Sequence, residues 1–270
     1  MITDYKTTID GLEIYYRTSG NPENQHLVFL HGWAARLDGS LGCDKVIFEL
    51  AKYFYVVAAE HPGLIRSTPP KAIWGMDDFA HILNKLLTPL NLKNPIVMGQ
   101  SFGGGVATAY AKLYPQEIRF LILVDAITTK RKRNFFQKLK FIWWPAFSFL
   151  VKSKWIPLTL KKVLINISLG VPTKMISKLN AESYSVMGEI PLSERYYLNL
   201  DYKSLAMPLF LIWGDRDTWV TPVQRAKEIH SEVKESKLLI LKGPHTILYK
   251  NPKYAVGEII KLLPQYRNYV

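Results

Sequence analysis

The chain has 270 residues, 48% of them hydrophobic, which is enough to bury the core of one domain with an insertion. Its formal net charge is +13, and its one cysteine, Cys43, excludes an intramolecular disulfide and fits a reducing compartment. Met1–Lys6 lacks the apolar core of a secretory signal, and the chain holds no uncharged apolar stretch of membrane-spanning length. We therefore expect a cytoplasmic protein without a membrane span, and contact with a membrane surface stays open.

The chain begins with two alternating segments, Tyr5–Ile9 and Leu12–Arg17, joined by Asp10-Gly11. Asp-Gly between such segments is typical of a β-hairpin. Short apolar runs rich in Val, Ile and Leu then recur, mostly separated by segments long enough for a helix. They cover residues 27–30, 54–59, 95–98, 120–124, 209–213 and 238–241. This rhythm predicts an α/β protein with a mostly parallel central sheet and helices on both faces, whose ligands bind beyond the carboxyl ends of the strands.

The run at 95–98 is followed at once by the pentapeptide Gly99-Gln100-Ser101-Phe102-Gly103 and then by a helix-like stretch, Gly104–Ala111. Gly-x-Ser-x-Gly between a strand and a helix is the pattern of a nucleophile elbow. In so sharp a turn a Cβ at Gly99 or Gly103 would clash with neighbouring backbone, and the Ser101 hydroxyl projects from the sheet edge. The pattern predicts a nucleophilic Ser101, and a plain turn or a glycine-rich helix start is the structural alternative.

A nucleophilic serine needs a base, an orienting acid and donors for an oxyanion. Three further motifs follow apolar runs: His31-Gly32-Trp33 after the run at 27–30, Gly214-Asp215-Arg216-Asp217 after the run at 209–213, and Lys242-Gly243-Pro244-His245 after the run at 238–241. In a parallel sheet all of them lie at the same edge as Ser101.

Through the order of these motifs the chain resembles the α/β-hydrolase superfamily, over nearly its whole length outside one central segment. The family places its acid after a later strand and its histidine near the C-terminus, in the order Ser, Asp, His. The resemblance therefore implies Asp217 as the triad acid and His245 as the base. Two other acids stay open: Asp215, whose structural alternative is to cap the loop, and Asp125, which follows the run at 120–124, where some relatives place the acid.

The same likeness assigns the oxyanion hole to the N–H after the nucleophile and to one N–H from the loop after an early strand. By position these are the N–H groups of Phe102 and Trp33. His31 and Gly32 then shape the oxyanion loop, and we predict a structural role for His31 instead of a role as base. The Trp33 side chain is expected to help wall the acyl pocket.

The strand rhythm breaks between about residues 128 and 205, where relatives insert a helical cap. We therefore predict a hydrolase core at 1–127 and 206–270 and a helical cap, or lid, at 128–205. Residues 126–181 contain twelve Lys or Arg, several Trp and Phe, and no Asp or Glu. Two interpretations stay open: an apolar side that roofs the pocket with lysines in solvent, or contact of a basic aromatic face with an anionic membrane. The segment contains no recognised nucleic-acid-binding motif, so a nucleic-acid partner is not expected.

Together these residues predict a serine esterase, lipase or lactonase that cleaves carboxylic esters, including lactones, of a small or apolar-acyl substrate. C–C bond hydrolases, amidases and acyltransferases of the same family use the same triad, and a non-catalytic binder or peripheral membrane protein is the alternative from another class. The sequence contains no metal-binding or nucleotide-binding motif, so we expect neither a metal nor a cofactor. The oligomeric state is not predicted.

Overall fold

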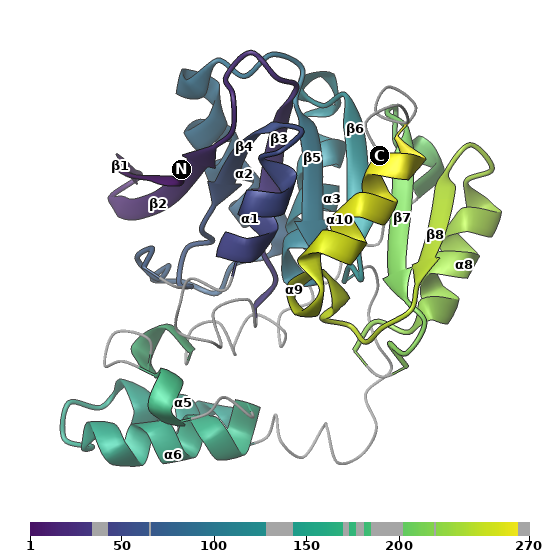
Figure 1. Cartoon of the computed structure of the whole chain (residues 1–270). Helices are drawn as coiled ribbons and strands as arrows, with labels where there is room; N and C mark the ends of the chain where they lie inside the picture. The colour runs from purple at the N-terminus through teal and green to yellow at the C-terminus, as the bar shows by residue number, and fades with distance from the viewer. Residues whose placement is uncertain are drawn as a thin grey trace.

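The computed structural model describes residues 1–33, 43–64, 66–127, 143–169, 173–176, 181–184, 202–218 and 220–263. Their centre is an eight-stranded sheet with the spatial order β1-β2-β4-β3-β5-β6-β7-β8 (Figure 1). The strands are β1 (Thr3–Ile9), β2 (Leu12–Ser19), β3 (His26–Leu30), β4 (Tyr55–Ala59), β5 (Ile96–Gln100), β6 (Phe120–Val124), β7 (Leu209–Gly214) and β8 (Lys237–Leu241).

The first three strands in this spatial order pair antiparallel, and every later pair is parallel. This confirms the predicted mostly parallel sheet, and the bounds of each predicted apolar run differ from those of its strand by two residues at most. The hairpin is also confirmed: Asp10 and Gly11 join β1 to β2 with φ angles of 50° and 76°. Both angles lie in the region that two-residue hairpin turns of the Asp-Gly kind require.

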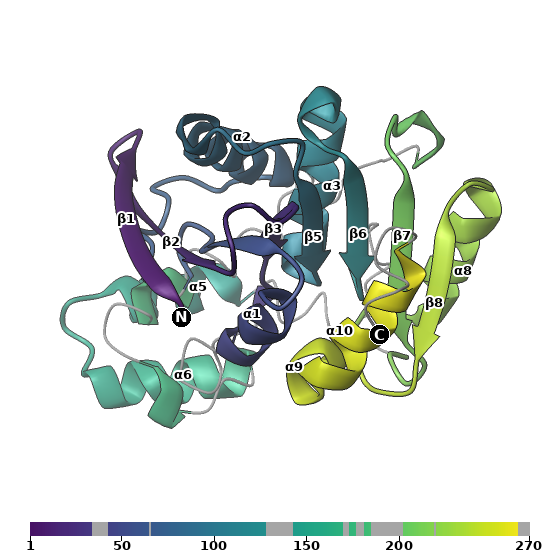
Figure 2. The ribbon, with the colours of Figure 1, turned by 45° about the horizontal axis from the view of Figure 1, so that its top comes forward.

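Helices cover both faces of the sheet (Figure 2). On one face α2 (Met76–Leu87), α3 (Phe102–Leu113) and α8 (Val223–Glu232) pack into one hydrophobic core. On the other face α1 (Asp44–Leu50), α9 (Ile247–Lys250) and α10 (Pro252–Leu262) pack into a second core. Every residue of β5 is buried, because a central parallel strand is covered on both sides. Short 3₁₀ turns are η2 (Thr88–Leu90), η3 (Pro115–Glu117), η4 (Thr173–Met175) and η7 (Tyr202–Ser204).

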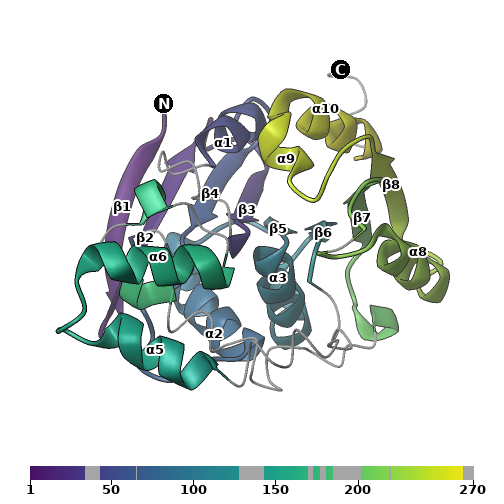
Figure 3. The same ribbon diagram turned by 90° about the horizontal axis from the view of Figure 1, so that it is seen from below.

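Two further helices, α5 (Trp144–Lys152) and α6 (Leu158–Leu169), lie beyond the edge of the sheet at which the parallel strands end (Figure 1, Figure 3). They surround a small core of their own, which consists of Phe147, Val151, Ile165, Ile176, Ala181 and Tyr184. Trp33, directly after β3, packs against this core and also against the core of the sheet. The α5–α6 pair is thus attached at the oxyanion loop that the sequence predicts.

The division of the chain into a hydrolase core and a helical cap is not tested by the described residues and is still a prediction. Its first boundary, residue 128, lies outside the described residues, and so do the basic residues 130–133. Among the helices of the described ranges, none combines the length and the apolar character that crossing a bilayer requires.

Candidate active site

Ser101 lies between β5 and α3, at the carboxyl-terminal edge of the sheet. Its φ of 51° and ψ of −114° form a conformation that a non-glycine residue keeps only where its surroundings hold it. Hydrogen bonds supply that hold. The Ser101 N–H donates to the Val124 carbonyl of β6 at 3.0 Å, and the Ser101 carbonyl accepts the N–H groups of Gly104 and Ile127, each at 3.0 Å. The fold therefore stabilises a sharp turn in which Ser101 is the residue with the strained backbone.

Both flanking glycines of this turn lack room for a side chain. A Cβ on Gly99 would lie 2.3 Å from the Gly103 carbonyl oxygen, and a Cβ on Gly103 would lie 2.2 Å from the Leu30 carbonyl oxygen. The obstacles are backbone atoms, so no change of side-chain rotamer relieves them. Glycine is required here because α3 begins in close contact with the ends of β5 and β3.

The imidazole of His245, after β8, connects Ser101 with Asp217, after β7. Its Nε2 lies 2.9 Å from Ser101 Oγ, and its Nδ1 lies 2.6 Å from Asp217 Oδ2. An ionised carboxylate only accepts, so Nδ1 carries the proton and Nε2 can accept the serine hydroxyl. Ser101 and Asp217 are buried and His245 is partly buried. This arrangement can activate a serine for nucleophilic attack.

The carboxylate of Asp217 is 2% exposed and is held by its own loop. Its Oδ1 accepts the N–H groups of Val220 and Thr221, each at 3.1 Å, and its Oδ2 accepts the Thr221 hydroxyl at 2.6 Å. Burial raises the pKa of Asp217, but the hydrogen bonds from His245 and Thr221 outweigh burial and bring the pKa below its ordinary value. Asp217 is therefore ionised at neutral pH and can stabilise a charged His245.

The two alternative acids have other partners. Asp125, fully buried after β6, accepts the Gly214 N–H at 2.8 Å, and burial, helped by the nearby charge of Asp217, raises the pKa of Asp125 well above its ordinary value. Asp215 is exposed and accepts the Gly243 N–H at 2.8 Å, which caps the loop. Of the three candidate acids, Asp217 is the one in contact with His245 in the described part of the chain.

Asp125, Asp217 and His245 offer ligand atoms that all lie within 4.8 Å of one another, a spacing that a metal ion could bridge. Both ring nitrogens of His245 are already used, one toward Asp217 and one toward Ser101. Burial raises the pKa of Asp125 and so disfavours the ionised carboxylate that a metal ligand needs. The arrangement fits a Ser-His-Asp site better than it fits a metal centre.

The loop that carries Gly32 and Trp33 lies directly against the elbow. A Cβ on Gly32 would lie 2.0 Å from Gln100 Oε1 and 3.2 Å from Ser101 Cβ. Phe102 is the first residue of α3, so its N–H belongs to the helix end that adjoins Ser101. The structure thus places Phe102 directly after Ser101 and Gly32, the residue before Trp33, in contact with the elbow, and the role of the Trp33 and Phe102 N–H groups is still a prediction.

His31 is buried and engages backbone groups of its own loop and the next one. Its Nδ1 donates to the Gly32 carbonyl at 2.9 Å, and its Nε2 accepts the His61 N–H at 3.4 Å. The His61 Nε2 in turn faces the His31 carbonyl at 3.0 Å. Burial, and next to it the presence of His31, lower the pKa of His61 well below its ordinary value. These contacts fit the predicted structural role of His31.

Three side-chain contacts around the site have no signal in the sequence. The Thr221 hydroxyl lies 3.2 Å from His245 Nδ1 and also bonds Asp217, so it supports the acid–base pair. The Tyr249 hydroxyl, on α9, accepts the Gly32 N–H at 3.0 Å and so ties the predicted oxyanion loop to α9. The Gln100 amide donates to the His245 carbonyl at 3.1 Å. The partners in the Tyr249 contact are 217 positions apart in the chain, and those in the Gln100 contact are 145 positions apart. Sequence motifs do not reveal contacts over such separations.

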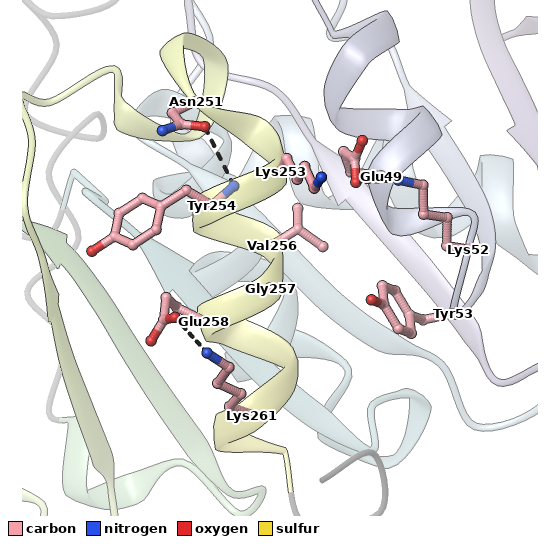
Figure 4. Close-up of a pocket in the computed structure, with 10 residues that line it drawn as sticks. All are labelled: Glu49, Lys52, Tyr53, Asn251, Lys253, Tyr254, Val256, Gly257, Glu258 and Lys261. Atoms are coloured by element: carbon pink, nitrogen blue, oxygen red, sulfur yellow. Dashed lines mark hydrogen bonds and ion pairs between the residues drawn. The ribbon is translucent and has the colours of Figure 1, made fainter. Parts of the chain in front are cut away.

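A groove of about 440 Å³ lies elsewhere, between α1 and α10 (Figure 4). Two of its lysines are paired: Lys52 with Glu49 at 2.6 Å and Lys261 with Glu258 at 2.8 Å. Its lining contains neither Ser101 nor His245. The groove is therefore separate from the residues of the candidate active site.

Comparison with known proteins agrees with the architecture of the sheet and its helices. Residues 25–252 match the family described as the alpha/beta hydrolase fold. The chain belongs to this family, which confirms the predicted superfamily and supports hydrolysis as the coarse class of activity. An uncharacterized protein of Mycobacterium tuberculosis is 26% identical over 258 residues, which cover 87% of this chain and 73% of that protein.

Two solved structures share the fold. A bacterial membrane phospholipase A has a TM-score of 0.71 at 23% identity and covers 99% of this chain and 87% of its own. The enol-lactonase of Burkholderia xenovorans LB400 has a TM-score of 0.74 at 15% identity and covers 95% of this chain and 98% of its own. At such identities the likeness shows the architecture alone.

Proposed function

We propose that this protein is a serine hydrolase that cleaves carboxylic esters, including lactones, through an acyl-enzyme. The observation that carries the proposal is the unbroken line Ser101 Oγ, His245 and Asp217, with contacts of 2.9 and 2.6 Å. The strained backbone of Ser101 supports it further, because such strain is concentrated at functional sites.

In the proposed reaction Ser101 Oγ attacks the substrate carbonyl while His245 Nε2 takes the serine proton. The N–H groups of Trp33 and Phe102 bind the resulting oxyanion. His245 then gives its proton to the leaving alkoxide, and the acyl group stays on Ser101. A water molecule attacks this acyl-enzyme as His245 takes one water proton, and His245 returns that proton to Ser101 when the acid leaves. Asp217 keeps the imidazole in the tautomer that each step needs.

The names of the two solved relatives, a phospholipase A and an enol-lactonase, support ester and lactone substrates for this site. Residues 128–205 are proposed to form the cap above it. The contact of Trp33 with the small core of α5 and α6 supports this, because the same residue belongs to the proposed oxyanion loop. A cap at this place would limit the length of the acyl group.

The test is a series of p-nitrophenyl esters from acetyl to palmitoyl, followed by lactones, measured as initial rates. Ser101→Ala is expected to lower kcat by about 10⁶-fold while the protein stays folded. Ser231→Ala, the same change on the exposed side of α8, is the matched control and should keep full activity. The acyl length with the highest rate reports the size of the space beneath the proposed cap.

Activity that survives Ser101→Ala would refute the serine mechanism. Folded protein that hydrolyses neither esters nor lactones would refute the substrate class, and amide, C–C bond or acyl-transfer chemistry would then take its place.

A further inference from the structure

The helices α5 and α6 each present an apolar side to solvent. On α5, Phe149 is 73% exposed and Leu150 is 37% exposed, and the first charge on this helix is Lys152 in its last turn. Trp155, in the link to α6, is 93% exposed. Large apolar side chains so fully exposed on one element are a common mark of an interaction surface.

On α6 the usual arrangement of a surface helix is reversed. Lys161 is 3% exposed, with Glu182 at 3.9 Å, whereas Leu160, Val163 and Ile167 are 46%, 44% and 71% exposed. A helix that meets only water and its own core places lysines outward and aliphatic residues inward. These three outward residues recur at the spacing of one helix face, so the reversal belongs to a whole face of α6.

Packing inside the protein does not account for these outward residues. Phe147, Val151 and Ile165 already point inward and form the small core of α5 and α6 with Tyr184. Each helix therefore has one apolar side that is used in folding and a second apolar side that is not. We name the second set, Phe149, Leu150, Trp155, Leu160, Val163 and Ile167, the outer apolar face.

The charge around this face selects its partner. Between Asp125 and Glu182 the sequence contains twelve Lys or Arg and no acidic residue. Of these, Lys152, Lys154 and Lys174 are exposed in the described part of this segment. A second copy of the chain would bring the same positive charges together, whereas an anionic bilayer complements them. Trp143, just before α5, and Trp155, in the link after it, are 69% and 93% exposed, and exposed Trp side chains suit the boundary between lipid and water.

We propose that the outer apolar face of α5 and α6 docks this protein on an anionic lipid bilayer. The apolar side chains enter the boundary between headgroups and acyl chains, and the lysines contact lipid phosphates. The docking needs no catalysis, so it goes beyond the proposed function. Because α5 and α6 lie beyond the edge of the sheet that carries Ser101, docking would place the membrane at the same end of the molecule as this edge (Figure 3).

The experiment is co-sedimentation of the full chain with vesicles, with Ser101→Ala in every sample so that no lipid is hydrolysed. One set of vesicles is phosphatidylcholine and the other mixes it with phosphatidylglycerol. We expect binding to the mixed vesicles, weaker binding in high salt, and little binding to phosphatidylcholine. Phe149→Ser with Ile167→Ser should lower the partition coefficient by roughly tenfold or more.

The control with the same two substitutions is Phe48→Ser with Ile73→Ser, at residues 50% and 46% exposed outside α5 and α6, which should leave binding unchanged. Quenching of tryptophan fluorescence by brominated lipid in the otherwise unsubstituted protein tests the docking even if a variant folds poorly. Absence of vesicle binding, equal binding to both vesicle types, or an equal loss in the control pair would overturn the proposal. So would a dimer in light scattering that Phe149→Ser with Ile167→Ser converts to a monomer.

Discussion

The sheet and the α5–α6 pair distribute apolar and charged residues in opposite ways. The apolar side chains of β5 are all buried, and in β6 all are buried except the half-buried Phe120. The lysines near the sheet, such as Lys6 and Lys85, lie outside in ion pairs with Glu13 and Asp10. In α6 a lysine is inside and Ile167 is outside. Folding of a single chain accounts for the first pattern. Folding does not account for the second pattern, and this difference is the reason for the proposed docking of α5 and α6 on a membrane.

The largest effect on activity in this comparison is expected at the sheet edge, where Asp217 contacts His245. Asp217→Asn should lower kcat by about 10⁴-fold, because an amide in place of the carboxylate no longer holds His245 in the reactive tautomer. Initial rates on the best p-nitrophenyl ester measure this. Asp215→Asn is the matched control two residues earlier in the chain and should cost less than about tenfold, since Asp215 caps a loop and does not contact His245 in the described structure. A silent Asp217→Asn would show that another acid orients the base.

A second test concerns how tightly the sheet edge is packed. Gly103→Ala should destabilise the protein by about 3 kcal/mol, because its Cβ would meet the Leu30 carbonyl oxygen at 2.2 Å. Gly257→Ala in α10 makes the same change where no atom lies within 4 Å, and should stabilise by about 0.5–1 kcal/mol through helix propensity. Urea unfolding of both variants gives the two free energies. Equal effects would mean that the elbow is less crowded than the structure indicates.

Local sequence patterns predicted the strands and the elbow because each depends on neighbouring residues. Runs of Val, Ile and Leu mark buried parallel strands, Asp10-Gly11 marks a hairpin, and the glycines around Ser101 mark a turn in which a Cβ has no room. These features are local in the chain, so one sequence carries them.

Contacts between distant loops could not be predicted in this way. The choice of Asp217 over Asp125 rested on a family resemblance. The physical reason appears only in space, where His245 and Thr221 donate the hydrogen bonds that stabilise the ionised carboxylate of Asp217. The anchor between Tyr249 and Gly32 also depends on how α9 meets the oxyanion loop. Composition showed that the α5–α6 segment is basic and aromatic, but the outward direction of Ile167 and the inward direction of Lys161 needed the structure.

Asp125 provides a pH-dependent test of the buried acid. Its pKa is raised in the folded state, so between the unfolded pKa, about 3.8, and the folded pKa the native protein binds one proton more than the unfolded chain. The contribution of Asp125 to the free energy of unfolding is therefore fully present below the unfolded pKa. It is lost as pH rises through the folded pKa, at up to about 1.4 kcal/mol per pH unit. Asp125→Asn should remove this decline.

The measurement is the free energy of unfolding in urea from pH 5 to pH 9 for both proteins. Ester hydrolysis by Asp125→Asn should stay within about tenfold of the unsubstituted protein, because its carboxyl is not among the partners of His245 in the described residues. Identical pH profiles would show that Asp125 is ionised in the folded protein. A loss as large as that of Asp217→Asn would make Asp125 the acid.

The smallest effect on stability is expected on the outer apolar face. Comparing it with the small core of α5 and α6 tests directly whether the outer residues contribute to folding. Ile165→Ser and Ile167→Ser are the same change two residues apart on α6, at 0% and 71% exposure. The inner substitution leaves a cavity and buries a hydroxyl in the small core, so it should cost about 3 kcal/mol in unfolding free energy. The outer substitution should change stability by no more than about 0.5 kcal/mol in water.

If Ile167→Ser costs as much as Ile165→Ser, the outer face is part of the folded core and its exposure needs no partner. If stability is kept while vesicle binding falls, the residue serves docking, because a side chain that adds nothing to folding but supports adhesion has its partner outside the protein.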